Sequence, residues 1–470
     1  MDGLKQLGAR LRREWIEFYN KVDWTYMTMI SLVFIAYVLI HDLTGETFLD
    51  HNLWDSYALQ TERWLQGHMD LDRNYRYLEI ATYNGRFYIS FPPFPSVLLI
   101  PWVLLYGYET PNNVIMIIYT MIALTLAYKL AGKFKVRKAM CAFWSIVVVL
   151  GCNMMWMSTR AGVWFQAQLI NMILLLAAIL AMLNNKRILS YICVACAVGC
   201  RPFSILYFFV LLVYYFVNDM KEYKEGIEKD TAINENKKEI KDKNEKEDKE
   251  TDGENKDKGI TLKGIKLYGT MFLKQFPGLI SAAAIGMCYM LYNFARFDDP
   301  LEFGHNYLPE FLESKDGQFH TNYVMYNLYR MFIRGIKLKK NWGLEFTIFD
   351  GFWMYIANPI FLLLFACIIL CIAKRIKKEY RFNPVKITIL IMLVLNILCL
   401  CMHKTLGGWQ FGNRYLVDLI PFVYLYILAT KQQRGTVNKL NRLEILIGTF
   451  AVMFNVYGAV YMHIDLLLRN

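Results

Sequence analysis

The sequence predicts an all-α polytopic membrane protein with about 11 transmembrane helices and with juxtamembrane helices in a long first outer loop. Of its 470 residues, 56% are hydrophobic and 20% are charged, whereas soluble globular chains have about 45–50% apolar and about 25% charged residues. The apolar residues gather in nearly uncharged runs of about 18–25 residues, the length that spans a hydrocarbon core of about 30 Å. All ten cysteines lie in or beside these runs. These observations exclude a soluble enzyme, a disordered chain and a secreted disulfide scaffold.

Eleven apolar segments are the predicted spans. They are residues 24–40, 112–131, 139–157, 164–183, 188–200, 202–217, 270–292, 351–373, 386–402, 415–430 and 442–462. Residues 188–217 can form either one tilted helix or two short passes. Two passes are favoured because Pro202 breaks helical hydrogen bonding and because they keep the later basic loops on one side of the membrane.

Short clusters of Lys and Arg follow the second, fourth, eighth and tenth spans, and they explain the net charge of +12 without a nucleic-acid partner. The positive-inside rule puts such clusters in the cytoplasm. The N-terminus is then cytoplasmic and the C-terminus lies outside. The long outer loops, where any chemistry is expected, lie on the extracytoplasmic face.

This topology divides the chain into four parts. They are an amphipathic cytoplasmic segment (1–23), a transmembrane module (24–217), a charged cytoplasmic loop (218–267) and a second transmembrane module (268–470). The charged loop has too few aliphatic residues to offset the entropy of folding, so we expect it to be disordered. The three longest outer loops, residues 43–111, 293–350 and 403–414, hold most of the candidate site residues.

The first outer loop contains a helical pattern over residues 52–67 that ends at a glycine. Asp55 and Glu62 are seven residues apart, two helical turns, and so are predicted to share one face. Paired carboxylates at a membrane surface suit glycosyl transfer, where one deprotonates the attacking hydroxyl while the other orients it or holds a cation. The alternative is the solvated face of an amphipathic helix. Residues 96–106 are too short to span and are expected to form a juxtamembrane or re-entrant helix.

Three arginines lie at or near the predicted membrane boundary: Arg160, Arg201 and Arg414. An ionisable group at such a place is a functional hypothesis by default. The planar guanidinium fork suits a pair of phosphate oxygens, as in the headgroup of a phosphorylated lipid. Arg414 and Asp418 are four residues apart, so the alternative for Arg414 is a simple ion pair with Asp418.

The order of several motifs resembles that of the bacterial multi-pass glycosyltransferases of the GT-C superfamily, which includes protein-mannosyltransferase-like enzymes (glycosyltransferase family 39). A basic N-terminus and one span precede an acidic amphipathic helix that ends in WLQG. The later motifs are NGRFYISFPPFPSVLLIPWVLLYG, RAGVWFQAQ, CRPFS and GGWQFGNRYLVDLIPF. The resemblance covers nearly the whole chain except the charged loop.

This resemblance implies a sugar donor carried on a polyprenyl phosphate, an active site on the outer face of the bacterial plasma membrane and a role in the cell envelope. It implies a catalytic acidic residue close after the first span, for which Asp55 is the best match and Asp50 the next. The sequence has Asp50-His51 and Asp55-Ser56 where the family often has an adjacent Asp-Glu pair.

The expected site residues therefore fall into three groups. The predicted catalytic carboxylates are Asp55, Glu62 and Asp50. The predicted contacts to the donor phosphate are Arg86, Arg201, Arg414 and Arg160. The predicted contacts to the sugar are Tyr88, Trp164, His305 and Trp409, although interfacial anchoring explains outer-loop aromatics equally well.

The sequence implies no particular cofactor, and a divalent metal stays open as an alternative that no ligand cluster supports. The expected partners are a polyprenyl-phosphate-linked sugar, the lipid bilayer, and a glycan, lipid or protein acceptor. The expected reaction is an inverting displacement that moves the sugar to an acceptor hydroxyl with a carboxylate base. The alternative is a transporter or flippase of a lipid-linked glycan, which would more often show internal repeats and broken helices.

Overall fold

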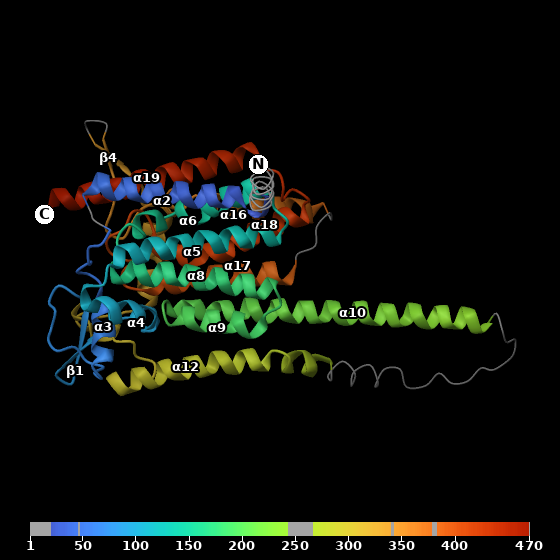
Figure 1. Ribbon diagram of the computed structural model, residues 1–470, viewed down its shortest axis with the longest axis horizontal. Helices are drawn as coiled ribbons and strands as arrows, with labels where there is room; N and C mark the ends of the chain where they lie inside the picture. The colour runs from blue at the N-terminus through green and yellow to red at the C-terminus, as the bar shows by residue number, and fades with distance from the viewer. Residues whose placement is uncertain (1–19, 46–47, 243–266, 340–342, 378–382, 470) are drawn as a thin grey trace, which may run out of the picture.

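The computed structural model describes residues 20–45, 48–242, 267–339, 343–377 and 383–469, and it is almost entirely helical. Its long helices lie side by side along the longest axis of the molecule (Figure 1). Within the described residues, seven are long and apolar enough to span a membrane. They are α2 (Trp24–Thr44), α5 (Asn112–Lys133), α8 (Val163–Leu183), η2 with α10 (Pro202–Leu206 and Tyr207–Asp242), α12 (Phe276–Phe297), α17 (Pro384–Met402) and α19 (Arg442–Arg469).

Four shorter apolar helices complete the bundle. They are α6 (Lys138–Leu150), α9 (Arg187–Val198), α16 (Ile360–Ile376) and α18 (Ile420–Gln433). Each of the eleven predicted segments contains one of these long or short helices, so the predicted helical multi-pass architecture is confirmed. The short helices end or begin at identifiable breaks. Pro359 and Pro421 lie at the N-terminal ends of α16 and α18. Proline is tolerated there because the backbone N–H that it lacks would have no acceptor within the first turn of the helix.

The core of the bundle lies around α8 and α18. In α8, 72% of the most apolar window of 18 residues is buried, compared with 22% in α12. Helices α5 and α9 pack against α8, and nearly all of α18 is buried. Helix α12 packs mainly on α9 and lies at the edge of the bundle (Figure 1). Helix α8 is apolar on all sides, and a helix of this kind is buried among other helices or in lipid. Helix α12 instead leaves large apolar side chains exposed, as expected for a helix beside lipid.

Residues 188–217 form two antiparallel passes rather than one helix. Arg187, at the start of α9, donates a hydrogen bond of 2.9 Å from Nη1 to Oδ2 of Asp219 in α10. Ser190 and Tyr215 also bond across the two helices through their hydroxyls, at 2.9 Å. The chain reverses at Arg201, whose backbone is extended, and at Pro202, which opens η2. The predicted break at Arg201-Pro202, with a helix on each side of it, is therefore confirmed.

The charged segment differs from the prediction in its first part. Helix α10 continues to Asp242 and extends past the ends of the other helices (Figure 1), so residues 218–242 are helical rather than disordered. Lys and Glu are good helix formers, and Lys221 lies 3.7 Å from Glu225 one turn later. The rest of the predicted loop, residues 243–266, and the predicted amphipathic segment 1–19 lie outside the described residues.

The first outer loop folds at one end of the bundle, opposite the end from which α10 extends (Figure 1). We call it the loop end. This part of the chain consists of α3 (Ser56–Leu65), a hairpin of β1 (Ile80–Tyr83) and β2 (Arg86–Ile89), α4 (Phe94–Tyr106) and η1 (Gly107–Glu109). Asn84 and Gly85 form the turn of this hairpin, with positive φ of 48° and 74°. Helix α4 packs against α3 and is too short to span, as predicted.

The second outer loop joins α12 to α16 through short elements. They are η3 (His305–Tyr307), α13 (Pro309–Leu312), η4 (Thr321–Tyr323), α14 (Val324–Phe332), β3 (Lys337–Leu338), β4 (Leu344–Glu345) and α15 (Met354–Ala357). Phe319 pairs with His403 and Phe349 pairs with Trp409 as isolated β-bridges. These bridges join the second outer loop to the third, which leads into η5 (Arg414–Leu419).

Candidate active site

A cavity of about 800 Å³ lies at the loop end of the bundle. Its wall comes from the first outer loop, the segment between α7 (Met154–Met157) and the start of α8, the break between α9 and η2, residues 301–319, Phe349, and residues 396–418. Many of the lining side chains are aromatic, among them Trp54, Phe91, Trp164, Phe303, Phe319 and Trp409. A few charged groups stand among these rings. An apolar pocket with a few polar groups is the usual form of a ligand site.

Glu79 enters the cavity from the first outer loop. It stands directly before β1, and the pairing of Ile80 with Ile89 in β2 fixes its place. Its Oε2 accepts a hydrogen bond of 3.2 Å from Nε1 of Trp164, in the first turn of α8. Burial raises the pKa of Glu79 above its ordinary value, the bond from Trp164 opposes this rise and the negative charge of Glu310 adds to it. A carboxylate with a raised pKa in a cavity is suited to accept a proton.

Arg201 and Asp418 form an ion pair on the cavity wall. Nε of Arg201 donates to Oδ2 of Asp418 at 2.8 Å, and Asn171 donates from Nδ2 to Oδ1 of the same carboxylate at 3.0 Å. The guanidinium lies over the ring of Tyr415, with 4.7 Å from Cζ to the ring centroid. Arg201 lies in the non-helical break before Pro202, and its side chain lines the cavity. Its charge is neutralised by Asp418.

Arg414 opens η5, lines the cavity and is 4% exposed. Its Nε donates to the carbonyl of Gly407 at 2.7 Å, and its Nη1 donates to Oε1 of Gln168 at 3.0 Å. Both acceptors are neutral, and among the described residues no carboxylate forms an ion pair with this guanidinium. The alternative ion pair between Arg414 and Asp418 is not the arrangement observed, because Asp418 pairs with Arg201.

Four more predicted residues line the cavity: Arg160, Trp164, His305 and Trp409. The ring of His305 lies edge-on to that of Phe91, with 5.0 Å between centroids. Burial lowers the pKa of His305 to about 3 and that of His403, another lining residue, to about 4. Both rings are therefore neutral at pH 7, and the arginines supply the positive charge of the site.

Asp55 is the N-cap of α3 rather than a residue on its face. It is completely buried: Oδ1 accepts from the backbone N–H groups of Tyr57 and Ala58 at 3.1 and 3.2 Å, and Oδ2 accepts from Nδ2 of Asn112 at 2.7 Å. The side chain of Asp55 therefore bonds to the first turn of α3 as a cap, which the predicted pairing with Glu62 did not include. Neither carboxylate is part of the cavity lining.

Three other predicted residues lie away from the cavity. Asp50 and Arg86 are exposed, and Arg86 lies beside the turn of the β1–β2 hairpin. Tyr88 is buried against Phe297, with 5.3 Å between ring centroids. Arg86 and Tyr88 are two residues apart in β2, so their side chains share one face of the hairpin.

Sequence reasoning missed Glu79, Glu310 and Gln168 as site residues. Glu79 lies in the aromatic run YRYLEIATY, where a single carboxylate beside a strand is a weak signal. Gln168 lies one helical turn after Trp164, on the buried side of α8, where a polar side chain needs a partner. Among the described residues, no group of three His, Cys, Asp or Glu side chains gathers as a metal site.

A scan of protein-family models matches no family, and a search of curated proteins finds no match. Among solved structures, the chain is similar to ArnT from Cupriavidus metallidurans bound to undecaprenyl phosphate, with 13% identity, a TM-score of 0.46, and coverage of 94% of this chain and 70% of that chain. It is also similar to the apo oligosaccharyltransferase of Archaeoglobus fulgidus, with 12% identity, a TM-score of 0.43, and coverage of 95% of this chain and 56% of that one. The chain thus spans little more than half the length of the archaeal protein. This degree of similarity assigns no family, activity, substrate or residue role.

Proposed function

We propose that the protein is a membrane glycosyltransferase that moves a sugar from a polyprenyl-phosphate donor to an acceptor hydroxyl. The observation that supports this most is the cavity of about 800 Å³ that gathers Glu79, Arg201 and Arg414 at one end of an apolar helix bundle. A polyprenyl chain needs an apolar, lipid-facing surface, and its phosphate needs cations at the membrane boundary. The aromatic wall offers flat apolar surfaces to the faces of a sugar.

The donor phosphate is assigned to Arg414, with Arg160 as its neighbour on the wall. Arg414 is held by two neutral acceptors, so a phosphate would meet a guanidinium that forms no ion pair within the described part of the chain. Arg201 already pairs with Asp418, and its role in this proposal is to shape the wall and to keep Asp418 neutralised. Buried in a site that excludes water, a charge-assisted hydrogen bond from Arg414 to phosphate would be strong.

Glu79 is assigned as the base. As the acceptor oxygen forms its bond to the anomeric carbon, the bond from that carbon to the phosphate oxygen breaks and its electron pair leaves with polyprenyl phosphate. The acceptor proton passes to the carboxylate of Glu79. Because phosphate is a good leaving group, no general acid is needed. Attack opposite the leaving group inverts the anomeric centre.

The reaction is assigned to the extracytoplasmic face of the membrane. The positive-inside rule predicts that the basic loops are cytoplasmic, and the loops that line the cavity are then on the opposite side of the membrane. In that orientation the cavity opens among the outer loops, where a glycan, lipid or protein acceptor of the cell envelope would meet the donor.

Two measurements on the full chain in lipid nanodiscs test the proposal. Native mass spectrometry with undecaprenyl phosphate should show one bound lipid, and the Arg414→Gln variant should bind less. A panel of polyprenyl-phosphate pentoses and hexoses, with membrane extract as the source of acceptors, should release free polyprenyl phosphate. Movement of intact sugar-lipid across proteoliposomes without this release would overturn the proposal in favour of a flippase.

A further inference from the structure

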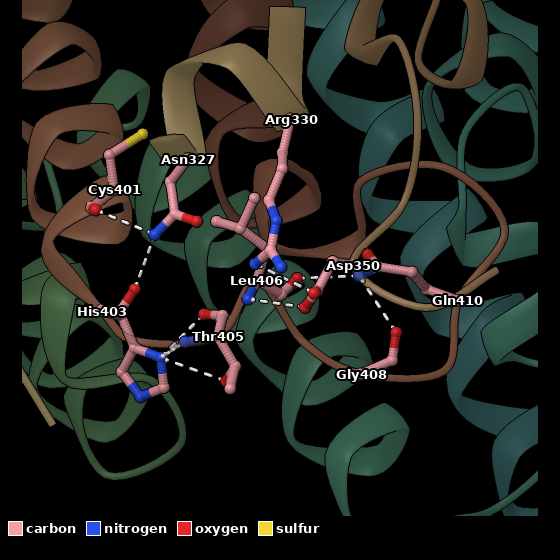
Figure 2. A network of polar contacts seen from close by, with 9 residues as sticks. All are labelled: Asn327, Arg330, Asp350, Cys401, His403, Thr405, Leu406, Gly408 and Gln410. Carbon is pink, nitrogen blue, oxygen red and sulfur yellow. Dashed lines mark hydrogen bonds and ion pairs between the residues drawn. The ribbon is translucent and has the colours of Figure 1, made fainter. Parts of the chain in front are cut away.

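Helix α14 connects to the cavity through a buried ion pair that does not itself line the cavity. Nη1 of Arg330, near the end of α14, donates to Oδ2 of Asp350 at 2.9 Å (Figure 2). The side chain of Arg330 is 16% exposed and that of Asp350 is 6% exposed. A charge pair with so little exposure is costly to leave half-made, so the two side chains have a strong preference for this geometry.

Asp350 holds the third outer loop with both its side chain and its backbone. Its Oδ1 accepts from the backbone N–H of Leu406 at 3.2 Å, and its own backbone N–H donates to the carbonyl of Gly408 at 3.0 Å (Figure 2). These bonds fix both sides of Gly407. Gly407 and Gly408 have positive φ of 110° and 63°. Because glycine adopts many backbone conformations, these two residues do not hold this conformation by themselves. The loop therefore depends on Asp350 for its conformation.

The same loop positions Arg414. The carbonyl of Gly407 accepts the hydrogen bond from Nε of Arg414 at 2.7 Å. Gln410 connects the two ends of the loop: its Nε2 donates to the carbonyl of Leu406 at 2.8 Å, and its Oε1 accepts from the backbone N–H of Arg414 at 2.6 Å. A shift of residues 406–408 would therefore move the guanidinium of Arg414 directly.

Asn327 provides a second attachment from α14. Its Nδ2 donates to the carbonyls of Cys401 at 3.0 Å and His403 at 2.7 Å, at the junction of α17 and the third outer loop (Figure 2). Helix α14 thus holds the loop at its start through Asn327 and at its middle through Arg330 and Asp350.

We propose that Arg330 and Asp350 are positioning residues that fix the 406–408 segment, and through the Gly407 carbonyl the guanidinium of Arg414, in the orientation that binds an anionic lipid headgroup. This inference rests on the proposed function, because the phosphate of the donor is the ligand that Arg414 would meet.

The direction of the effect separates positioning from simple electrostatics. Asp350→Asn removes a negative charge near the site, so Coulomb attraction alone predicts tighter binding of an anion. Loss of positioning predicts weaker binding. Asparagine tolerates the positive φ of 62° at this position, so the backbone is preserved. Arg330→Gln should weaken binding to the same degree, because either change breaks the same ion pair.

The experiment measures the affinity for undecaprenyl phosphate of the full chain in nanodiscs. We expect Asp350→Asn and Arg330→Gln each to weaken binding roughly 10-fold, as small misplacements of binding groups commonly do. The double variant should be no weaker than either single variant. Arg334→Gln is the matched control. It removes the same positive charge four residues after Arg330, and this variant should bind undecaprenyl phosphate as the wild type does.

A second background shows whether the effect passes through Arg414. Arg414→Lys keeps the positive charge but lacks the Nε–H that bonds to the Gly407 carbonyl. In that background Asp350→Asn should cause no further loss. An equal loss in both backgrounds, or tighter binding by Asp350→Asn, would overturn the inference.

Hydrogen exchange of residues 403–414 provides a readout that does not depend on a ligand. Exchange in this segment should rise in Asp350→Asn and Arg330→Gln while that of α8 stays unchanged. If the wild-type protein binds no undecaprenyl phosphate, the proposed function fails, and the exchange data alone decide whether the ion pair holds the loop. Unchanged exchange in both variants would overturn that role.

Discussion

The indole Nε1 of Trp164 donates a hydrogen bond of 3.2 Å to Oε2 of Glu79 and so joins the first outer loop to the first turn of α8. This bond acts against the effect of burial. Burial favours the protonated carboxyl, while a donor aimed at the oxygen favours the ionised form. Burial is the larger effect, so the pKa of Glu79 is raised, while the bond from Trp164 stabilises the ionised carboxylate. Both properties suit the general base proposed above.

Replacement of Glu79 should remove the chemical step and leave donor binding intact. For Glu79→Gln we expect the rate constant for transfer to fall roughly 100- to 10,000-fold, the usual contribution of a general base. The affinity for undecaprenyl phosphate should not weaken, because the change removes a negative charge. Single-turnover transfer and lipid binding by native mass spectrometry measure the two effects.

Two carboxylates serve as controls for this assignment. Glu310 also lines the cavity, and Glu62 is a predicted catalytic residue outside its wall. Glu310→Gln and Glu62→Gln should each retain most of the transfer rate. If Glu310→Gln is inactive while Glu79→Gln is active, the base is Glu310.

The pH dependence of transfer should report the pKa of Glu79. The rate should fall as the pH is lowered through this pKa, and the midpoint should lie above the value of an ordinary glutamate because burial raises it. Trp164→Phe keeps an aromatic ring but removes the donor, so the ionised form loses support and the midpoint should move to higher pH. A pH–rate profile of both proteins tests this. An unmoved midpoint would show that another group limits the rate.

The same raised pKa makes a prediction about stability. The folded state binds the proton of Glu79 more tightly than the unfolded state, so its stabilising contribution is complete below the unfolded pKa and is lost as pH rises through the folded pKa. Glu79→Gln cannot ionise and should lose less stability over that interval. Thermal unfolding in detergent between pH 4 and pH 8, compared with wild type, measures the difference. Parallel curves for the two proteins would contradict it.

Asp55 allows a test of the sequence-based assignment against the observed cap. Asparagine is as good an N-cap as aspartate, but while its Oδ1 caps α3 its Nδ2 faces the Nδ2 donor of Asn112. Asp55→Asn should therefore lose about 1–3 kcal/mol but still fold and, with Glu79 as base, retain most of its transfer activity. Asp55→Ala should lose about 1 kcal/mol from the cap and about 1–3 kcal/mol more from the unsatisfied Asn112. Unfolding in mixed micelles measures both.

The control for Asp55 is Asp50→Asn, a change of the same type at an exposed position nearby. It should alter neither stability nor transfer. An Asp55→Asn protein that folds but transfers no sugar would return the catalytic role to Asp55, as the motif resemblance implied.

The architecture could be predicted because it follows from local features of the chain. Runs of apolar residues need the length of a membrane span, and Pro202 interrupts one of them where the chain then reverses. The helix that continues to Asp242 was missed because a charged sequence that cannot form a core can still form a helix by local pairing, as Lys221 and Glu225 illustrate.

The site was predictable only in part. Arg201, Arg414 and Trp164 could be found because charged and amphipathic residues at membrane boundaries are few. Glu79 could not, since its approach to Trp164 depends on how the first outer loop folds over α8. The cap formed by Asp55 could not be predicted, because spacing along a helix does not indicate which residue caps it, and the catalytic role of Asp55 stays a prediction.

The ion pair of Arg201 and Asp418 provides the last prediction. Arg201→Gln leaves the Asp418 carboxylate, which is 5% exposed, without its cation. Breaking a buried pair from one side costs about 3–5 kcal/mol. Asn171 still donates to Asp418, so the loss should fall at the low end of this range. The Arg201→Gln/Asp418→Asn double variant removes the unpaired charge and should regain much of the stability.

Arg86→Gln, at an exposed arginine predicted to bind phosphate, is the control and should change neither stability nor lipid affinity. The free energy of unfolding in mixed micelles orders these variants. A double variant less stable than Arg201→Gln would show that Asp418 stabilises the fold through partners other than Arg201.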